Sequence, residues 1–137
     1  MKRVLIVDDE PHVTRLVALR LRKEGYEAFT AAHGVEALAL FESDGPFDVV
    51  VTDYNMPKMD GRELCETIRH RYAGQQIYIF LVTARLEEPL RSWAGDLPRV
   101  DYIEKPISLR DLVGRLEKLF GEPVEADEGP ESEPGDA

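Results

Sequence analysis

The chain has 137 residues, a formal net charge of -10 and 43% hydrophobic residues, which suits one domain with a packed core. No apolar run approaches the length of a membrane span, and the short apolar run behind Lys2 and Arg3 is too brief for a signal peptide. The single cysteine, Cys65, excludes an internal disulfide. We therefore expect a cytoplasmic protein that does not act at a membrane.

The negative charge is concentrated near the carboxyl end. Residues 122–137 contain seven acids and no lysine or arginine, so residues 1–120 carry a formal charge of only about -3. Direct nucleic-acid binding requires a concentrated basic face, which neither part of the chain has. Residues 121–137 are also rich in glycine and proline, which predicts a disordered acidic tail or linker stub after a domain at residues 1–120.

Strand and helix patterns alternate through residues 1–120. Apolar runs predict buried strands at residues 3–7, 47–52 and 77–82. Shorter or less apolar patterns predict two more strands, at 27–31 and 100–103, of which 27–31 is weak by itself because Ala28 is small. Helical spacing predicts a first helix with Val13, Leu16, Val17 and Leu21 inward, a second at 34–43, and a third with Leu64, Cys65 and Ile68 inward. A last helix begins after Ser108, with Asp111 three residues on as in a capping box, and ends at Gly121.

The segment 86–99 is the least regular part of the domain. Pro89, Gly95 and Pro98 leave room only for a short helix near residues 89–94, with Pro89 in its first turn. Five strands alternating with five helices predict right-handed crossovers and a doubly wound α/β sheet.

Polar side chains follow four of the expected strands. Asp8 and Asp9 end the first strand, Asp53 the third, Thr83 the fourth and Lys105 the fifth. Ligands of such sheets bind in the crevice beyond the carboxyl ends of the strands. We therefore expect three carboxylates, a hydroxyl and an ammonium group to meet in one crevice.

This set of side chains suits a divalent cation and a phosphoryl group. Mg²⁺, or Mn²⁺ in its place, prefers oxygen ligands, and bound metal relieves the repulsion between clustered carboxylates. Asp9 and Asp53 are the expected direct ligands, Asp8 acts directly or through water, and the main-chain carbonyl of Asn55 completes the set. Asp53 is the expected nucleophile, which would form an aspartyl phosphate.

Two further groups are expected to contact the phosphoryl oxygens. Lys105 supplies a fixed positive charge for the in-line transition state, and Thr83 donates its hydroxyl once the phosphate is present. Pro106 follows Lys105 and fixes the local backbone, with an isomer that the sequence does not determine.

Four motifs in register carry a family resemblance. The stretches VLIVDDE (4–10), VVVTDYNMPKMDG (49–61), LVTA (81–84) and DYIEKP (101–106) resemble the receiver domains of bacterial two-component response regulators, including the chemotaxis regulators. The resemblance covers about residues 2–120. It implies a flavodoxin-like sheet of order 2-1-3-4-5.

The resemblance also implies a function. Asp53 would take a phosphoryl group from the phosphohistidine of a sensor histidine kinase or phosphotransfer protein, with Mg²⁺ required, and the chain would catalyse only its own phosphorylation and dephosphorylation. Thr83 and Tyr102 would form the switch, while Asn55 and Arg85 would tune the lifetime of the phosphate. The first helix would border the kinase-docking surface. A monomer or weak dimer is expected, and the sequence names neither the cognate kinase nor the downstream target.

The segment 86–99, which contains Trp93, departs from the usual receiver pattern, so the output face is expected to differ in shape.

Several alternative functions stay open. The chain is either a single-domain regulator or phosphorelay intermediate, or a module of a longer protein whose effector follows the acidic segment. A Mg²⁺-dependent phosphatase would need a second aspartate at position 55, where Asn55 stands. An interaction module without phosphorylation conflicts with the intact acid set, and a flavodoxin-type electron carrier lacks a Ser/Thr-rich phosphate loop. Arg62, Arg69 and Arg71 are expected on a solvated helix face.

Overall fold

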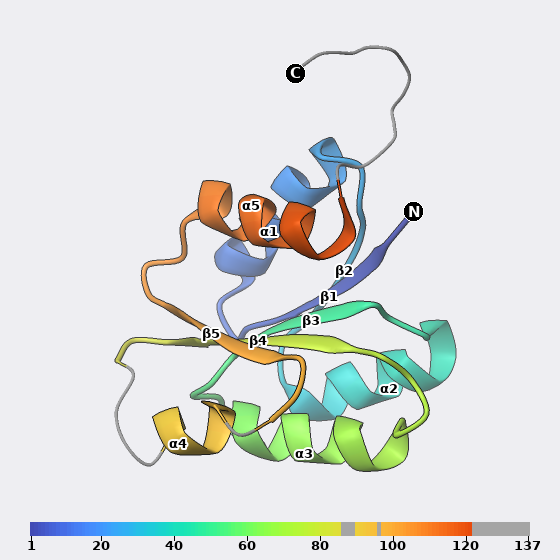
Figure 1. Ribbon diagram of the computed structural model, residues 1–137, viewed down its shortest axis with the longest axis vertical. Helices are drawn as coiled ribbons and strands as arrows, with labels where there is room; N and C mark the ends of the chain where they lie inside the picture. Colours follow the sequence, from blue (N-terminus) through green and yellow to red (C-terminus); the bar gives the residue numbers. More distant parts are fainter. Residues whose placement is uncertain (86–89, 96, 122–137) are drawn as a thin grey trace.

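The computed structural model describes residues 1–85, 90–95 and 97–121. Strands and helices alternate along the chain (Figure 1). In order, they are β1 (Arg3–Val7), α1 (Pro11–Lys23), β2 (Glu27–Ala31), α2 (Gly34–Asp44), β3 (Val49–Asp53), α3 (Gly61–Arg71), β4 (Tyr78–Thr83), α4 (Leu90–Gly95), β5 (Val100–Glu104) and α5 (Leu109–Phe120).

The strands form one parallel sheet of order β2-β1-β3-β4-β5, which confirms the flavodoxin-like prediction. The register brings the ends of the inner strands level with one another. Val7 pairs with Thr52, and Asp53 with Val82. Thr83 pairs with Glu104, directly before Lys105. The polar residues that follow the strands are therefore delivered to one edge of the sheet.

Helices cover both faces of the sheet. Figure 1 shows α1 and α5 on one face and α2, α3 and α4 on the other. Alternate strand residues accordingly enter two separate cores: Val4 and Ile6 pack with α1 and α5, whereas Leu5 and Val7 pack with α2 and α3. Burial on both faces explains why the strands read as continuous apolar runs.

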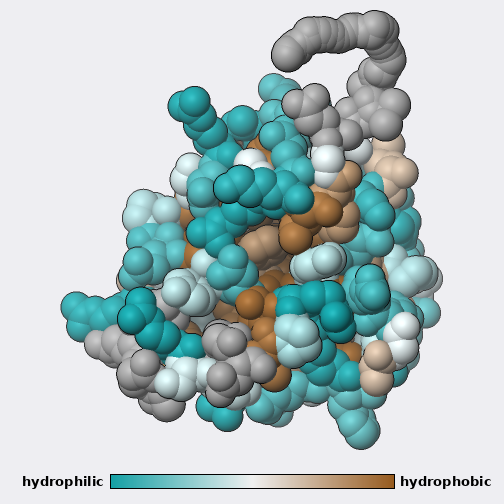
Figure 2. All heavy atoms as spheres, in the orientation of Figure 1, coloured by the Kyte–Doolittle hydropathy of each residue, from teal (hydrophilic) through white to brown (hydrophobic). Residues whose placement is uncertain are grey.

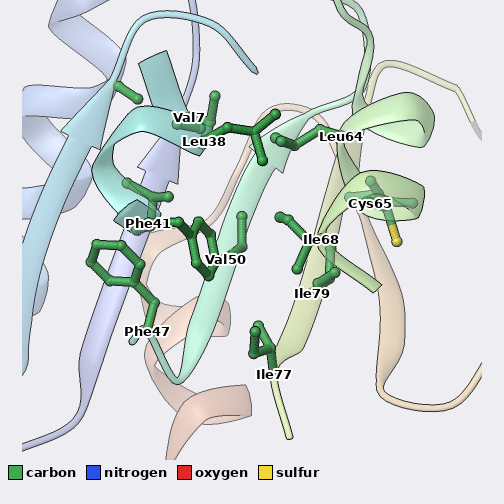
Figure 3. Packing of buried hydrophobic residues seen from close by; sticks show 14 of the residues in the cluster. Val7, Leu38, Phe41, Phe47, Val50, Leu64, Cys65, Ile68, Ile77 and Ile79 are labelled. Carbon is green, nitrogen blue, oxygen red and sulfur yellow. The ribbon is translucent and has the colours of Figure 1, made fainter. Parts of the chain in front are cut away.

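The core under α2 and α3 is tightly filled by aliphatic and aromatic side chains (Figure 3). Cys65 lies within it on α3, fully buried. Burial raises the pKa of this thiol to about 11, so Cys65 stays protonated and packs as a small hydrophobe, as its position on the apolar helix face predicts.

The third strand begins later than the apolar run suggests. Phe47 is buried but lies outside β3, where its ring makes edge contacts with Phe29 and Phe41, at centroid distances of 5.2 and 5.0 Å. The chain first joins the sheet at Asp48, whose N–H donates to the carbonyl of Arg3 at 2.8 Å. Aromatic packing in the core and strand pairing therefore produce the same apolar signal.

The prediction that Leu16 faces inward is wrong. Leu16 is 57% exposed, and the inward position is taken by Thr14, whose hydroxyl donates to the carbonyl of Pro11 at 3.0 Å. A threonine that satisfies its hydroxyl within its own helix can be buried like a valine, which hydropathy alone does not reveal. The other three residues of α1 that were predicted to face inward do so: Val17 and Leu21 are buried, and Val13 is half-buried.

The ends of the helices follow the expected chemistry. Ser108 caps α5 by accepting from the N–H of Asp111 at 3.1 Å, as predicted, and Asp60 caps α3 in the same way. His33 caps α2 through Nδ1, which accepts from the N–H of Glu36 at 3.2 Å. Two expectations, the placement of Pro89 and the disorder of residues 122–137, lie outside the described residues.

Most of the face seen in Figure 2 is hydrophilic, with apolar side chains gathered in a strip across its middle, between the two helical layers. Among the described helices, none combines the length and hydropathy that crossing a bilayer requires.

Candidate functional site

Three carboxylates converge at the carboxyl edge of the sheet, as the sequence predicts. Asp8 and Asp9 directly follow β1, and Asp53 is the last residue of β3, the neighbouring strand. One oxygen from each of the three lies within 4.8 Å of the other two. Asp53 is 4% exposed and Asp8 is 7% exposed, whereas Asp9 is open to solvent.

Asp8 is held in place by the backbone around it. Its N–H donates to the carbonyl of Ala31 at 3.1 Å, and its Oδ1 accepts from the N–H of Glu10 at 2.9 Å. Burial raises the pKa of the Asp8 carboxyl, opposed by the Glu10 hydrogen bond and reinforced by the negative charge of Asp53. The surroundings of Asp8 therefore disfavour its ionised form.

Lys105 supplies the cation that faces Asp53. Its Nζ lies 3.0 Å from Oδ1 of Asp53, although the side chain of the lysine is 37% exposed. Oδ1 receives no well-aligned hydrogen bond, so this ion pair is its main contact. Burial lowers the pKa of Lys105, but the contact with Asp53 and the charges of Asp8 and Glu10 outweigh it, and the net shift is upward.

The backbone brings Lys105 to this place. Its N–H donates to the carbonyl of Thr83 at 2.7 Å, which continues the β4–β5 pairing by one step. The Lys105–Pro106 peptide bond is cis, which answers the question that the sequence left open.

Thr83 lies at the end of β4 and is buried, but its hydroxyl is engaged elsewhere. Oγ1 donates to the carbonyl of Arg85 at 3.1 Å and accepts from the N–H of the same residue at 3.4 Å. Donation to a phosphoryl group on Asp53 would therefore require the hydroxyl to leave Arg85.

The remaining predicted residues lie around this centre. Asn55 is exposed in the loop after β3, and Arg85 is exposed after β4. Tyr102 is half-buried on β5, opposite Leu81. Its N–H donates to Oδ1 of Asp101 at 2.8 Å. The roles of these three residues stay predictions.

Gly61 is a site residue that sequence reasoning used only as part of a motif. Its N–H donates to the carbonyl of Tyr54 at 2.7 Å, which closes the loop that follows Asp53. A Cβ at this position would lie 2.8 Å from both the carbonyl oxygen of Asp53 and Cα of Tyr54. Only glycine allows α3 to begin this close to β3. The sequence signal that could have revealed this role is a glycine directly after Asp60, the N-cap residue of α3.

A cavity of about 420 Å³ opens beside the acids. Asp8, Asp53 and Lys105 line its polar end, and Val13, Val17 and Ile107 are among the apolar residues that line the rest. Asp53, although only 4% exposed, thus lines a cavity at this edge of the sheet.

The donor set fits a hard divalent cation. Three carboxylates that each bring an oxygen within 4.8 Å of the other two, two of them buried, face the ammonium group of Lys105, and oxygen donors of this kind suit Mg²⁺. The buried Oδ1 of Asp53, with only an ion pair to satisfy it, agrees with this fit.

The family of the chain follows from comparison with known proteins. The model of the response regulator receiver domain matches residues 4–117. The chain belongs to the response regulator receiver family. Receiver domains are signalling modules, and the acid cluster described above is typical of their magnesium site.

Solved receiver structures are similar over nearly their whole length. The Vibrio cholerae chemotaxis protein CheY4 is 30% identical with a TM-score of 0.79, and the alignment covers 88% of this chain and 99% of that chain. Response regulator TrrA of Thermotoga maritima, solved in complex with Mg²⁺ and BeF, is 38% identical with a TM-score of 0.72, covering 88% of this chain and 100% of that one.

Curated relatives are longer. Sensory transduction protein RegX3 of Mycolicibacterium smegmatis is 38% identical over 120 residues, which are 88% of this chain and 51% of the relative. The probable transcriptional regulator ycf27 of Cyanophora paradoxa is 38% identical over 119 residues, 87% of this chain and 48% of the relative. This receiver chain thus spans about half the length of the curated relatives it matches.

Proposed function

We propose that this receiver is a phosphorylation-dependent signalling switch in which Asp53 accepts a phosphoryl group from a phosphohistidine. The donor would be a sensor histidine kinase or a phosphotransfer protein. The observation that carries the proposal is the convergence of Asp8, Asp9 and Asp53 within 4.8 Å beside the ammonium group of Lys105.

The chemistry follows from the placement of these side chains. An oxygen of Asp53 attacks phosphorus in line with the departing histidine nitrogen; the new bond is O–P and the broken bond is N–P. Lys105 balances the negative charge of the equatorial oxygens as the transition state forms. The donor would reach Asp53 from the side of the cavity that this residue lines.

Asp8, Asp9 and Asp53 would hold Mg²⁺, or Mn²⁺, together with the main-chain carbonyl of Asn55. When bound, the cation neutralises charge shared between the carboxylates and the incoming phosphoryl group. The complex of the similar protein TrrA with Mg²⁺ and BeF supports this assignment.

The signal would leave the site through Thr83. Its hydroxyl donates to the carbonyl of Arg85 in this structure, and a phosphoryl group on Asp53 offers a charged acceptor in place of that carbonyl. The change would release the backbone at Arg85 from Thr83 and would shift Tyr102 on β5 between two packings. Asn55 and Arg85 would set how long the phosphate survives.

The lengths and names of the relatives bear on how the signal would be passed on. The matched relatives are about twice as long, and two of those named above are called a transcriptional regulator and a sensory transduction protein. Those names describe the relatives. For this chain we propose action through protein contacts, either alone or as the receiver part of a longer protein.

The phosphoacceptor can be tested by mass spectrometry after incubation with acetyl phosphate and Mg²⁺. The wild-type chain should gain the mass of one phosphoryl group, and Asp53→Asn should gain none, because the amide cannot attack phosphorus. Asp44→Asn is the matched control, since Asp44 is the last residue of α2, where its carbonyl accepts a hydrogen bond from Arg3 at the start of β1. Labelling of Asp53→Asn at the wild-type level would show that another residue is the acceptor.

A further inference from the structure

Helix α1 presents an unusual exposed face. Leu16 and Leu19 are 57% and 53% exposed, whereas the opposite side of the helix is buried against the sheet. The exposed positions form one continuous line at helical spacing. This line, called here the α1 stripe, consists of His12, Arg15, Leu16, Leu19, Arg22 and Lys23.

The α1 stripe is basic. Pro11–Lys23 contains four arginine or lysine residues and no acid. In the described part of the chain, Arg15 and Lys23 form no ion pair, and Arg22 donates to a neutral acceptor, the carbonyl of Ala28, at 2.7 Å. Arg20, which lies outside the stripe, pairs with Glu24 at 3.0 Å. The positive charge of the stripe is therefore largely uncompensated, in a domain that is acidic as a whole.

The carboxyl end of α5 lies at the same end of the sheet as the basic last turn of α1. The ammonium group of Lys2 lies 4.9 Å from the ring centroid of Phe120, the last residue of α5. The carbonyl of Lys2 in turn accepts from the N–H of Glu27, just after α1, at 2.9 Å. Phe120, at the end of α5, therefore lies at the same end of the domain as the last turn of α1.

Residues 122–137 match this surface in charge and in length. They carry seven acids and no lysine or arginine. Sixteen extended residues reach up to about 53 Å, whereas the 13 residues of α1 extend over about 20 Å. The segment is long enough to run along the whole helix without strain.

We propose that the acidic segment 122–137 lies along the α1 stripe of the same chain. The covalent connection holds its charges near the helix at an effective concentration in the millimolar range. The segment contains one β-branched residue, Val124, so the contact is mainly electrostatic and weakens as salt shortens the Debye length to about 3 Å at 1 M.

A spin label in the acidic segment tests the contact directly. Ser132→Cys provides the attachment point, and the native Cys65 does not compete because it is buried and its thiol pKa is about 11. In ¹⁵N spectra of the full chain at low salt, the label should broaden the amide signals of Arg15, Leu19 and Lys23 and leave those of α3, on the opposite face of the sheet, sharp. Uniform broadening, or none in α1, would overturn the proposal.

Charge variants distinguish an electrostatic contact from simple proximity. Arg15→Gln/Lys23→Gln should at least halve the broadening in α1, and raising the salt to about 1 M should have the same effect. The matched control is Arg71→Gln/Arg91→Gln, which removes two exposed cations from α3 and α4 and should change nothing. Equal broadening in all three chains would contradict the proposal.

A mixed sample identifies which molecule supplies the segment. Spin-labelled chain without ¹⁵N is mixed with unlabelled ¹⁵N chain, so that broadening arises only between molecules. We expect none, and strong broadening would show that the occupant is a second copy. Acetyl phosphate labelling of Asp53 in the same variants should be unchanged, so a loss of labelling would count against the proposed function and not against this contact.

Discussion

Asp8 and Asp53 are buried acids whose charges disfavour each other. Burial and the charge of Asp53 raise the pKa of Asp8 above the value of 3.8 expected in the unfolded chain. The folded state therefore binds more protons than the unfolded state between that value and the raised one. Stability contributed by protonated Asp8 is present at low pH and is lost as the pH rises through this window.

Asp8→Asn should consequently stabilise the metal-free protein. At neutral pH the amide removes a buried charge, and the free energy of unfolding should rise by about 1 kcal/mol, the usual scale of a single substitution. Below the unfolded pKa of 3.8 the difference should disappear, because the carboxyl is then protonated in both states. Urea denaturation with a chelator present, at several pH values, measures the difference.

Comparing wild type with Asp8→Asn in the presence of Mg²⁺ tests whether the charge of Asp8 serves to bind the cation. Mg²⁺ should raise the stability of the wild-type protein more than that of Asp8→Asn, because a ligand that binds only the folded state stabilises it according to its affinity. A variant that is less stable than wild type at neutral pH would contradict the account of Asp8.

At the scale of elements, the least expected feature is the bridge that Arg69 makes between α3 and the start of β5. Its Nη1 donates to the carbonyl of Ile77 at 2.7 Å, and its Nη2 to those of Pro98 and Arg99 at 3.0 Å. The prediction that Arg69 lies on a solvated helix face is wrong. Burial lowers the pKa of its guanidinium, which nevertheless remains charged.

Arg69→Met should lower the free energy of unfolding by about 2 to 3 kcal/mol, because it removes the guanidinium that donates to the carbonyls of Ile77 and Pro98. Arg71→Met is the control: Arg71 is exposed and its nearest acid, Glu42, is 3.7 Å away. It should change stability by no more than about 0.5 kcal/mol. Equal effects of the two substitutions would show that the bridge contributes nothing.

These elements also show what sequence can and cannot predict. Strands β1 and β3 were recognisable because burial on both faces gives each an uninterrupted apolar run, residues 4–7 in β1 and 49–51 in β3. The cap of α5 was recognisable because it is local in the sequence. Leu16 was misplaced because hydropathy does not reveal that Thr14 can be buried in its place, and Arg69 because its partners lie at distant positions of the chain. The stacking of Arg62 over the ring of Trp93, at 4.9 Å, was equally invisible, since it joins α3 to α4.

For the whole molecule, the sequence predicts the positions of the site residues better than it predicts the contacts made at the surface. Parallel strands end at one edge, so polar residues after β1, β3 and β5 had to meet there, and Asp8, Asp53 and Lys105 do. The direction of the Thr83 hydroxyl could not be foreseen, because it depends on the conformation of the chain at Arg85. The division at residue 120, where α5 ends, stays a prediction with respect to the segment that follows.

The central claim of the proposed function is that Asp8, Asp9 and Asp53 form one divalent-cation site, in which Asp53 would also accept the phosphoryl group. The most direct test is the anomalous signal of Mn²⁺ in crystals of the full chain soaked with manganese, since Mn²⁺ takes the same oxygen ligands as Mg²⁺. The account predicts one strong peak between these three carboxylates, which should vanish in Asp53→Asn crystals treated in the same way. Manganese bound elsewhere, with no density at this site, would contradict it.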